Sequence, residues 1–235
     1  MAFDTETIVD EVIELTKRLV ACFPVYGSDG ISEAQQIVCE QLKTIDGMEV
    51  IVDKYSADSI KHLDGYINVC DFQDIYANYE SVPKTNVYGI REGSGPTLIL
   101  NGHIDVDIAG STKEQNDDLR NTTADDRIFG RGTTDMLCGL SCMLICLKHF
   151  LKHHQVNNKI VFMSVCDEEI GGNGTLRANV TLDPFIALLP SKGYASSVFD
   201  VEAVTTKGNG SNVTLAIIAE PTECKYCTRS LGFSL

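Results

Sequence analysis

Apolar positions recur at two spacings along the chain, and the two spacings predict alternating helices and strands. Helical spacing predicts helices at residues 5–22, 32–44, 136–152 and 174–180. Short apolar runs predict buried strands at residues 48–52, 86–91, 97–100, 159–165 and 213–219. Residues 86–91 and 97–100 flank the turn sequence EGSGP and are predicted to pair as neighbouring strands. The alternation indicates an α/β fold with a mixed, mostly parallel sheet flanked by helices.

Two stretches lack a clear period. Residues 54–84 are predicted to form a long connection with at most one short helix. Residues 108–127 are polar and acidic, which predicts a surface loop.

Composition and charge narrow the class of protein. A chain of 235 residues can form one large domain or two small ones. The formal net charge of −14 argues against nucleic acid or an anionic membrane as the main partner. No apolar run approaches the roughly 20 residues that cross a bilayer, and the acidic N-terminus MAFDTETIVDE does not resemble a secretory signal. We therefore expect a cytoplasmic protein, whose nine cysteines are reduced.

The stretch TLILNGHIDVD, residues 97–107, is the first candidate site. Its apolar run predicts a buried strand that ends at Asn101-Gly102 and is followed by His103 and Asp105. Alternate residues of an extended chain point the same way, so the imidazole and the carboxylate are expected on one side of the strand's carboxyl end. Open α/β sheets bind their ligands at this end. The pair is either a metal ligand with its orienting carboxylate or a plain hydrogen-bonded pair.

Three further stretches place carboxylates at the end of an apolar segment. Asp135, in IFGRGTTDM, stands at a predicted helix entrance and can alternatively be an N-cap. The strand IVFMSVC runs into Asp167, Glu168 and Glu169, which repel one another unless solvent or a cation neutralises them. Glu220 follows the apolar run LAIIA, as at an ordinary strand end. Together with the histidine, these ends offer the nitrogen and oxygen ligands that suit zinc.

The motifs NGHIDV, GRGTTDM, DEEIGGNGT and AEPTE, in this order, closely resemble those of the dinuclear zinc amidohydrolases. This family includes acetylornithine deacetylase, succinyl-diaminopimelate desuccinylase, aminoacylase and carboxypeptidase G. The amino-acid sequences of the motifs are most similar to those of acetylornithine deacetylase. The resemblance covers nearly the whole chain. It implies a zinc-peptidase-like catalytic fold, two Zn²⁺ ions with Co²⁺ as a substitute, and hydrolysis of the amide bond of small N-acyl amino acids or peptides.

The resemblance also implies a role for each site residue. The residues that it assigns to metal binding are His103, Asp135, Glu169 and Glu220. Asp135 would bridge the two ions, and a cis peptide bond would follow it. Glu168 would act as general base and general acid, and Asp105 would orient the histidine.

The chain departs from the family pattern at its C-terminal end. It stops at Leu235, where the family begins an inserted lid domain and later supplies a further histidine ligand. We therefore expect residues 1–235 to be the N-terminal portion of a catalytic domain, without the lid and dimerisation domain. A weakened second zinc site and no family-type homodimer are expected as well. The alternatives are a truncated and inactive chain, a dipeptidase or aminopeptidase of the same family, and a non-enzymatic interaction domain.

Overall fold

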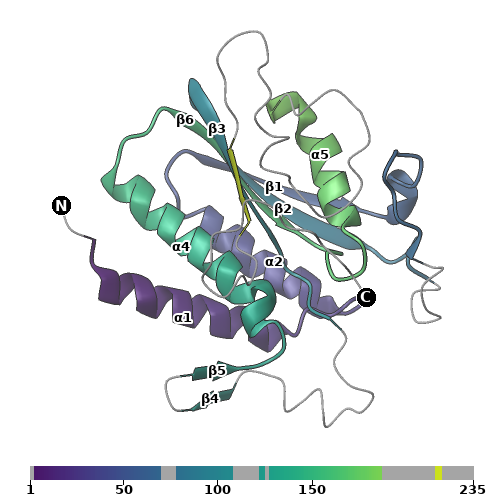
Figure 1. The fold of residues 1–235 in the computed structure, drawn as a ribbon, viewed down its shortest axis with the longest axis horizontal. Coiled ribbons are helices and arrows are strands. Elements are labelled where there is room, and N and C mark those ends of the chain that lie inside the picture. The colour runs from purple at the N-terminus through teal and green to yellow at the C-terminus, as the bar shows by residue number, and fades with distance from the viewer. Residues whose placement is uncertain (1–2, 70–77, 108–121, 125–126, 187–214, 219–235) are drawn as a thin grey trace.

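The computed structural model describes residues 3–69, 78–107, 122–124, 127–186 and 215–218. Within these residues a mixed sheet carries helices on both faces (Figure 1), which confirms the predicted mixed α/β fold. The helices are α1 (Thr5–Cys22), α2 (Asp29–Leu42), α4 (Cys138–His153) and α5 (Asn173–Ile186), with two short turns, the 3-10 helix η1 (Ala57–Ser59) and the π-helical η4 (Thr133–Leu137). The strands are β1 (Met48–Tyr55), β2 (Lys84–Arg91), β3 (Gly95–His103), β4 (Thr122–Ala124), β5 (Arg127–Phe129), β6 (Asn158–Val165) and β7 (Leu215–Ile218).

The main sheet among the described residues has the order β1-β2-β6-β3-β7. β1 pairs with β2 and β2 with β6 in antiparallel fashion, whereas β3 runs parallel to both β6 and β7. The predicted pairing of 86–91 with 97–100 is wrong, because β6 lies between these two strands. The segment that connects β2 to β3 crosses the start of β6 closely. A Cβ atom at Gly93 in this segment would lie 2.4 Å from the main chain of Asn158. β6, buried from Ile160 to Val165, takes the central place and pairs with both strands.

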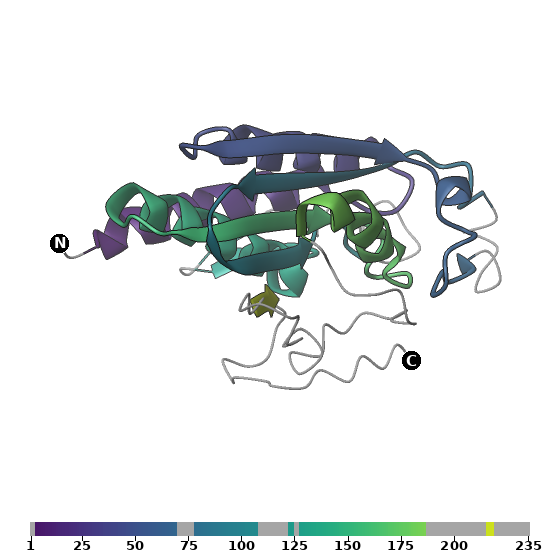
Figure 2. The same ribbon diagram turned by 90° about the horizontal axis from the view of Figure 1, so that it is seen from above.

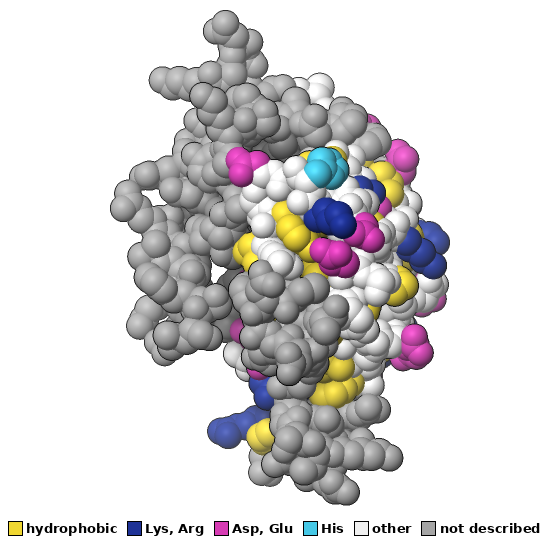
Figure 3. Space-filling model, turned by 90° about the vertical axis from the view of Figure 1, so that its right-hand side faces the viewer, with side chains coloured by type: hydrophobic (Ala, Val, Ile, Leu, Met, Phe, Trp, Pro, Cys, Tyr) yellow, Lys and Arg dark blue, Asp and Glu magenta, His cyan; other side chains and the backbone are white. Residues whose placement is uncertain are grey.

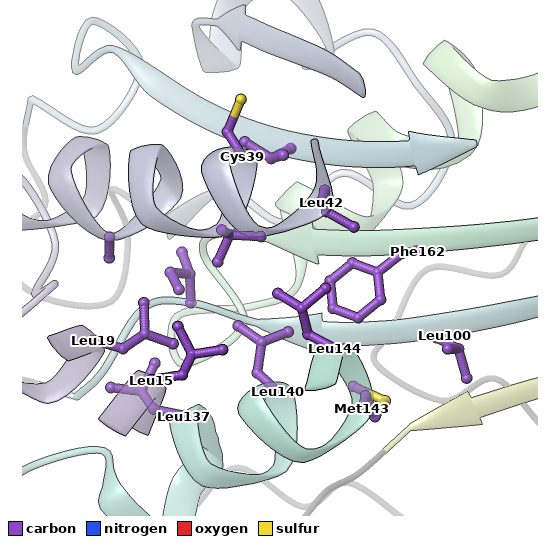
Figure 4. Packing of buried hydrophobic residues seen from close by; sticks show 14 of the residues in the cluster. Leu15, Leu19, Cys39, Leu42, Leu100, Leu137, Leu140, Met143, Leu144 and Phe162 are labelled. Atoms are coloured by element: carbon purple, nitrogen blue, oxygen red, sulfur yellow. The ribbon is translucent and has the colours of Figure 1, made fainter. Parts of the chain in front are cut away.

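The two faces of the sheet pack against different helices, because successive side chains of a strand point to opposite faces. Figure 2 shows α5 on the near side of the strands and α1 and α2 on the far side. The larger core cluster joins α1, α2 and α4 to one face (Figure 4), through residues that include Leu19, Leu42, Leu144, Leu100 and Phe162. The smaller cluster joins α5 to the other face, through Ala178, Leu182, Tyr88, Ile99 and Val161.

Element boundaries differ from the predictions at several places. Asp4 caps α1, since its carboxylate accepts a hydrogen bond from the Thr7 N–H at 3.2 Å. α2 begins at Asp29 rather than near Ser32, and α5 extends to Ile186. β4 and β5 form a small antiparallel sheet where a surface loop was predicted, while residues 108–121 lie outside the described residues.

One helical stretch, Thr133–His153, is long and apolar enough to cross a membrane by length and composition alone. Its best window has a mean hydropathy of 1.4, so the expectation that no stretch approaches this length is wrong. Half of that window is buried, and Leu140 and Leu144 lie in the core against α1 (Figure 4). The core helix of a soluble protein passes the same test, and the stretch is therefore weak evidence for a membrane span.

The parallel pairing of β3 with β6 determines where the candidate site lies. His103, the last residue of β3, is paired with Val165, the last residue of β6. The segments that follow both strands therefore begin at the same edge of the sheet. This edge brings the histidine motif next to the acidic motif, although some 60 residues of chain separate them.

Candidate metal centre

His103, Asp135 and Glu169 lie together at the carboxyl end of β3 and β6. Within the described part of the chain, one potential ligand atom from each of the three lies within 4.8 Å of the others. His103 Nε2 is 3.1 Å from Asp135 Oδ1. The histidine side chain is 1% exposed and the aspartate side chain 54% exposed, so a buried imidazole faces an accessible carboxylate. Such a site can hold an ion and still admit a substrate.

The main chain of Asp105 orients the imidazole. His103 Nδ1 lies 2.9 Å from the carbonyl oxygen of Asp105 but 3.7 Å from its Oδ1 atom. The tautomer that carries its proton on Nδ1 donates to this carbonyl and directs the Nε2 lone pair at Asp135. The predicted orienting role of the Asp105 carboxylate stays a prediction, since the observed contact is made by the main chain.

The Asp105 carboxylate instead holds the acidic turn. It accepts hydrogen bonds from the main-chain N–H groups of Glu168 at 3.2 Å and Glu169 at 3.1 Å. Glu169 Oε1 accepts a further hydrogen bond from the Asp107 N–H at 3.2 Å. Glu168 Oε2 lies 3.9 Å from His103 Nε2, beside the three-ligand cluster. This is where a general base for an attacking water would have to be.

The chain around Asp135 is shaped by a close turn. Gly132 has a φ of 82°, and a Cβ atom there would lie 2.2 Å from Val106 Cγ1, so glycine is required. Asp135 has φ −117° and ψ 103°, and α4 begins only at Cys138 without a side-chain cap. The N-cap interpretation of Asp135 is therefore wrong. The peptide bond from Asp135 to Met136 is cis, as the family pattern implied.

The centre holds more negative charge than its own residues neutralise. Burial raises the pKa of Glu169 to about 7, and the charges of neighbouring carboxylates add to this while His103 opposes it. Burial likewise raises the pKa of Asp105 to about 7, again against the influence of His103. The ionised form of both groups is disfavoured until a cation is nearby. The donor set, one imidazole nitrogen and several carboxylate oxygens, fits zinc.

Asp167 differs from the two acidic residues that follow it. It is 2% exposed, has a φ of 67°, and accepts a hydrogen bond from the Tyr79 hydroxyl at 2.8 Å. In the sequence Asp167 is adjacent to Glu168 and Glu169 and was grouped with them. Only the buried strand before it indicated that the Asp167 side chain could point into the protein. Tyr79 carries no sequence signal, because the fold alone brings it to this turn.

The structure thus gathers most of the predicted site. The predicted residues that lie together are His103, Asp105, Asp135, Glu168 and Glu169. Glu220 lies outside the described residues. The last described residue before Glu220 in the sequence is Ile218, which ends β7 and pairs with Asn101 of β3.

A family model and several known proteins match the chain. The family model described as Peptidase family M20/M25/M40 matches residues 99–223, just over half of the chain. A succinyl-diaminopimelate desuccinylase of Rickettsia massiliae (strain Mtu5) is 28% identical over 134 residues, covering 54% of this chain and 35% of that protein. The enzyme of the same name from Buchnera aphidicola subsp. Cinara cedri is 35% identical over 104 residues, covering 43% of this chain and 28% of that protein. The matches thus span about a third of the length of these curated relatives.

Solved structures share the fold. Human carnosine dipeptidase 1 matches with a TM-score of 0.54 at 15% identity, over 77% of this chain and 38% of that one. The M20 family metallo-carboxypeptidase Sso-CP2 from Sulfolobus solfataricus matches with a TM-score of 0.52 at 18% identity, over 75% of this chain and 35% of that one. At these identities the likeness shows the fold alone.

Proposed function

Because the chain belongs to peptidase family M20/M25/M40, we propose that it hydrolyses the amide bond of small N-acyl amino acids with the help of bound metal. The observation that carries this proposal is the cluster of His103, Asp135 and Glu169, with Glu168 beside it. The name of the desuccinylases, which denotes removal of a succinyl group, supports an N-acyl amino acid as substrate. An acetylornithine deacetylase-like activity is the specific form that the motifs favour.

Members of this family are metal-dependent, and zinc is their typical metal. In our proposal His103, Asp135 and Glu169 hold the ion, and Glu220 is a further ligand. The proposal includes two zinc ions, for which Co²⁺ could substitute, and Asp135 would be among the residues that hold them. A bound zinc ion supplies a Lewis acid that polarises an amide carbonyl and lowers the pKa of water to about 7.

The chain's own residues then perform the proton transfers. Glu168 takes the proton of the attacking water at its carboxylate and later passes it to the leaving amine. The carbonyl oxygen of Asp105 keeps the His103 imidazole in one orientation. The Asp105 carboxylate keeps the main chain of Glu168 in place through its N–H group. The products are a carboxylate and a free amine.

The test is an assay of the purified chain with zinc or cobalt. We would measure free amine released from N-acetylornithine, N-succinyl-diaminopimelate and a set of dipeptides. Glu168→Gln should lower turnover by at least about 100-fold, the usual size of a general-base contribution, and leave metal affinity within a few-fold. Glu40→Gln, at an exposed position on α2, is the matched control and should change neither quantity.

The outcomes separate the alternatives. Turnover of dipeptides without turnover of acylated amino acids would replace the proposed substrate class by a peptidase. Metal binding without any turnover would favour a chain that is inactive by itself. Absence of metal binding, together with no effect of His103→Ala, would favour a non-enzymatic interaction domain.

Three expectations accompany this proposal. We propose that residues 1–235 form part of a catalytic domain and that the protein is cytoplasmic. Neither nucleic acid nor a membrane is a proposed partner. In support, acidic and basic side chains lie interspersed on the face seen in Figure 3, and the formal net charge is −14.

A further inference from the structure

One buried hydroxyl group joins the two ends of the turn that carries Glu168 and Glu169. The Tyr79 hydroxyl donates a hydrogen bond to Asp167 Oδ2 at 2.8 Å and accepts one from Asn173 Nδ2 at 3.0 Å. Asp167 and Asn173 are the residues on either side of the acidic turn, and neither they nor Tyr79 are more than 2% exposed. The Tyr79 hydroxyl therefore links the residue before the turn to the residue after it, on the side that faces the interior of the protein.

Tyr79 is itself held by the first residue of β2. The Lys84 ammonium group lies 3.8 Å from the centroid of the Tyr79 ring and donates to the Tyr79 carbonyl oxygen at 2.8 Å. β2 runs antiparallel to β6, with Val87 opposite Ser164, so the start of β2 lies beside the residues that follow β6. Burial raises the pKa of the Asp167 carboxyl, and the positive charge of Lys84 and the hydrogen bond from Tyr79 oppose this rise without cancelling it.

Asn173 ties the other end of the turn to a third segment. Its Nδ2 group donates to the carbonyl oxygen of Ile67 at 2.8 Å, and its Oδ1 atom accepts from the Ile67 N–H at 3.0 Å. The Tyr79 ring stacks on Tyr26 with a centroid distance of 5.9 Å. The interior side of the turn is thus fixed to the segments before β2, whereas the Asp105 carboxylate fixes its outer side.

We propose that Tyr79 is a positioning residue of the metal centre, whose hydroxyl keeps the turn in the conformation that directs Glu168 and Glu169 toward His103. This inference rests on the proposed function for what the centre binds, although among the described residues the hydroxyl bonds to Asp167 and Asn173 rather than to His103, Asp135 or Glu169. Asp167 has a φ of 67°, a conformation that is uncommon outside glycine, although aspartate adopts it more readily than most residues. The hydrogen bond from Tyr79 constrains this residue.

Tyr79→Phe tests the proposal, because it keeps the ring, its stacking and its contact with Lys84 but removes the hydroxyl. In the metal-free protein, amide hydrogen exchange of peptides that cover the turn should become about tenfold faster, as expected when a buried hydrogen bond is lost. Zinc or cobalt affinity, measured by calorimetry, should fall about tenfold, at the lower end of the range for groups that support metal ligands.

Tyr88→Phe is the matched control. Tyr88 is also fully buried, donates to a buried carboxylate (Asp53 Oδ2, 3.2 Å) and accepts from an amide (Asn86 Nδ2, 2.9 Å), but its hydroxyl bonds to neither Asp167 nor Asn173. In Tyr88→Phe, Asn86 keeps its own hydrogen bonds beside the turn, to the Gly174 carbonyl oxygen and from the Cys166 N–H. This variant should lose a similar amount of global stability. Exchange of the turn and metal affinity should stay within about twofold of the unaltered protein.

Two results would overturn the proposal. The first is unchanged exchange of the turn in Tyr79→Phe, and the second is an equal acceleration in Tyr88→Phe, which would indicate general loosening. Neither readout requires turnover, and the exchange readout requires no metal. A chain that fails to hydrolyse any substrate would thus contradict the proposed function while the role of Tyr79 is still decided.

Discussion

Two buried polar clusters lie on the same sheet and are balanced in opposite ways. At Asp53 on β1, the carboxylate accepts two hydrogen bonds from Arg177 at 2.8 and 2.9 Å and further ones from Thr181 at 2.9 Å and Tyr88 at 3.2 Å. At the metal centre, several carboxylates surround the single imidazole of His103. The first cluster has its cation within the chain, and the second has an excess of negative charge.

The difference in charge balance between the two clusters is seen in the pKa values of Asp53 and Glu169. Burial raises the pKa of the Asp53 carboxyl, but the hydrogen bonds and charge of Arg177, with Thr181 and Tyr88, outweigh it and lower the pKa below its usual value. Burial also raises the pKa of Glu169, and there the neighbouring carboxylates add to it. A cluster that neutralises itself stabilises the fold, whereas one short of positive charge indicates a cation-binding site.

The largest expected effect is the loss of stability in Asp53→Ala. It leaves the Arg177 guanidinium, whose side chain is 24% exposed, without its carboxylate. Breaking such a buried pair should cost about 3 kcal/mol in the free energy of unfolding, measured by urea denaturation. Asp58→Ala, the control, removes the exposed ion pair with Lys61 and should change the free energy of unfolding far less, because solvent screens exposed pairs. Equal losses in the two variants would show that burial does not distinguish the Asp53–Arg177 pair from the exposed Asp58–Lys61 pair.

Zinc should have the next largest effect, and in the opposite direction. At a free concentration 100 times the dissociation constant, it should raise the free energy of unfolding by about 2.7 kcal/mol. The gain should disappear on chelation and shrink in Glu169→Gln, but it should persist in Asp53→Asn. A gain that survives Glu169→Gln would place the ion elsewhere.

Acid should remove part of the stabilisation by Asp53. Its pKa is lowered in the folded protein, so its contribution is present above the unfolded value near 3.8 and is lost as pH falls through the folded value. The stability difference between the unaltered protein and Asp53→Asn should therefore shrink below about pH 4. This loss should be smaller than that in Asp53→Ala, because a protonated carboxyl keeps its hydrogen-bond acceptors. A difference that grows toward low pH would contradict the lowered pKa.

The smallest effect is expected for Glu169→Gln without metal. The folded pKa is raised from 4.5 to about 7, so this carboxylate lowers stability progressively as pH rises from about 4.5 to 7, and the full cost is present above pH 7. Removing its charge should raise stability by about 1 kcal/mol at pH 8 and change little at pH 5. A loss of stability at pH 8 would mean that the centre balances its own charge.

The sequence predicted those parts of the fold that depend on neighbouring residues. The apolar runs that became β3 and β6 were recognised because a buried strand needs only its own side chains to be identified. The pairing of these strands was missed, because the place of β6 between β2 and β3 depends on contacts between distant segments. The start of α2 was placed three residues late, near Ser32 rather than Asp29, since no apolar period marks its first turn.

The candidate site also has features that could be predicted from local sequence and features that depend on contacts between distant residues. His103, Asp135 and Glu169 each stand at the end of an apolar segment or beside a glycine turn, so their motifs were visible in the sequence. The hydrogen bonds from the acidic turn to the Asp105 carboxylate were not, because they join residues 63 and 64 positions apart. Tyr79 was missed for the same reason, at a separation of 88.

These separations have a consequence for how the protein folds. A contact across 88 residues forms only after the entropy cost of closing a long loop has been met, which slows folding of sheets with such an order of strands. During synthesis, His103 leaves the ribosome well before β6 and the acidic turn exist. The candidate metal centre therefore cannot be complete on the growing chain before β6 has been synthesised and has paired with β3, so metal binding would follow that pairing.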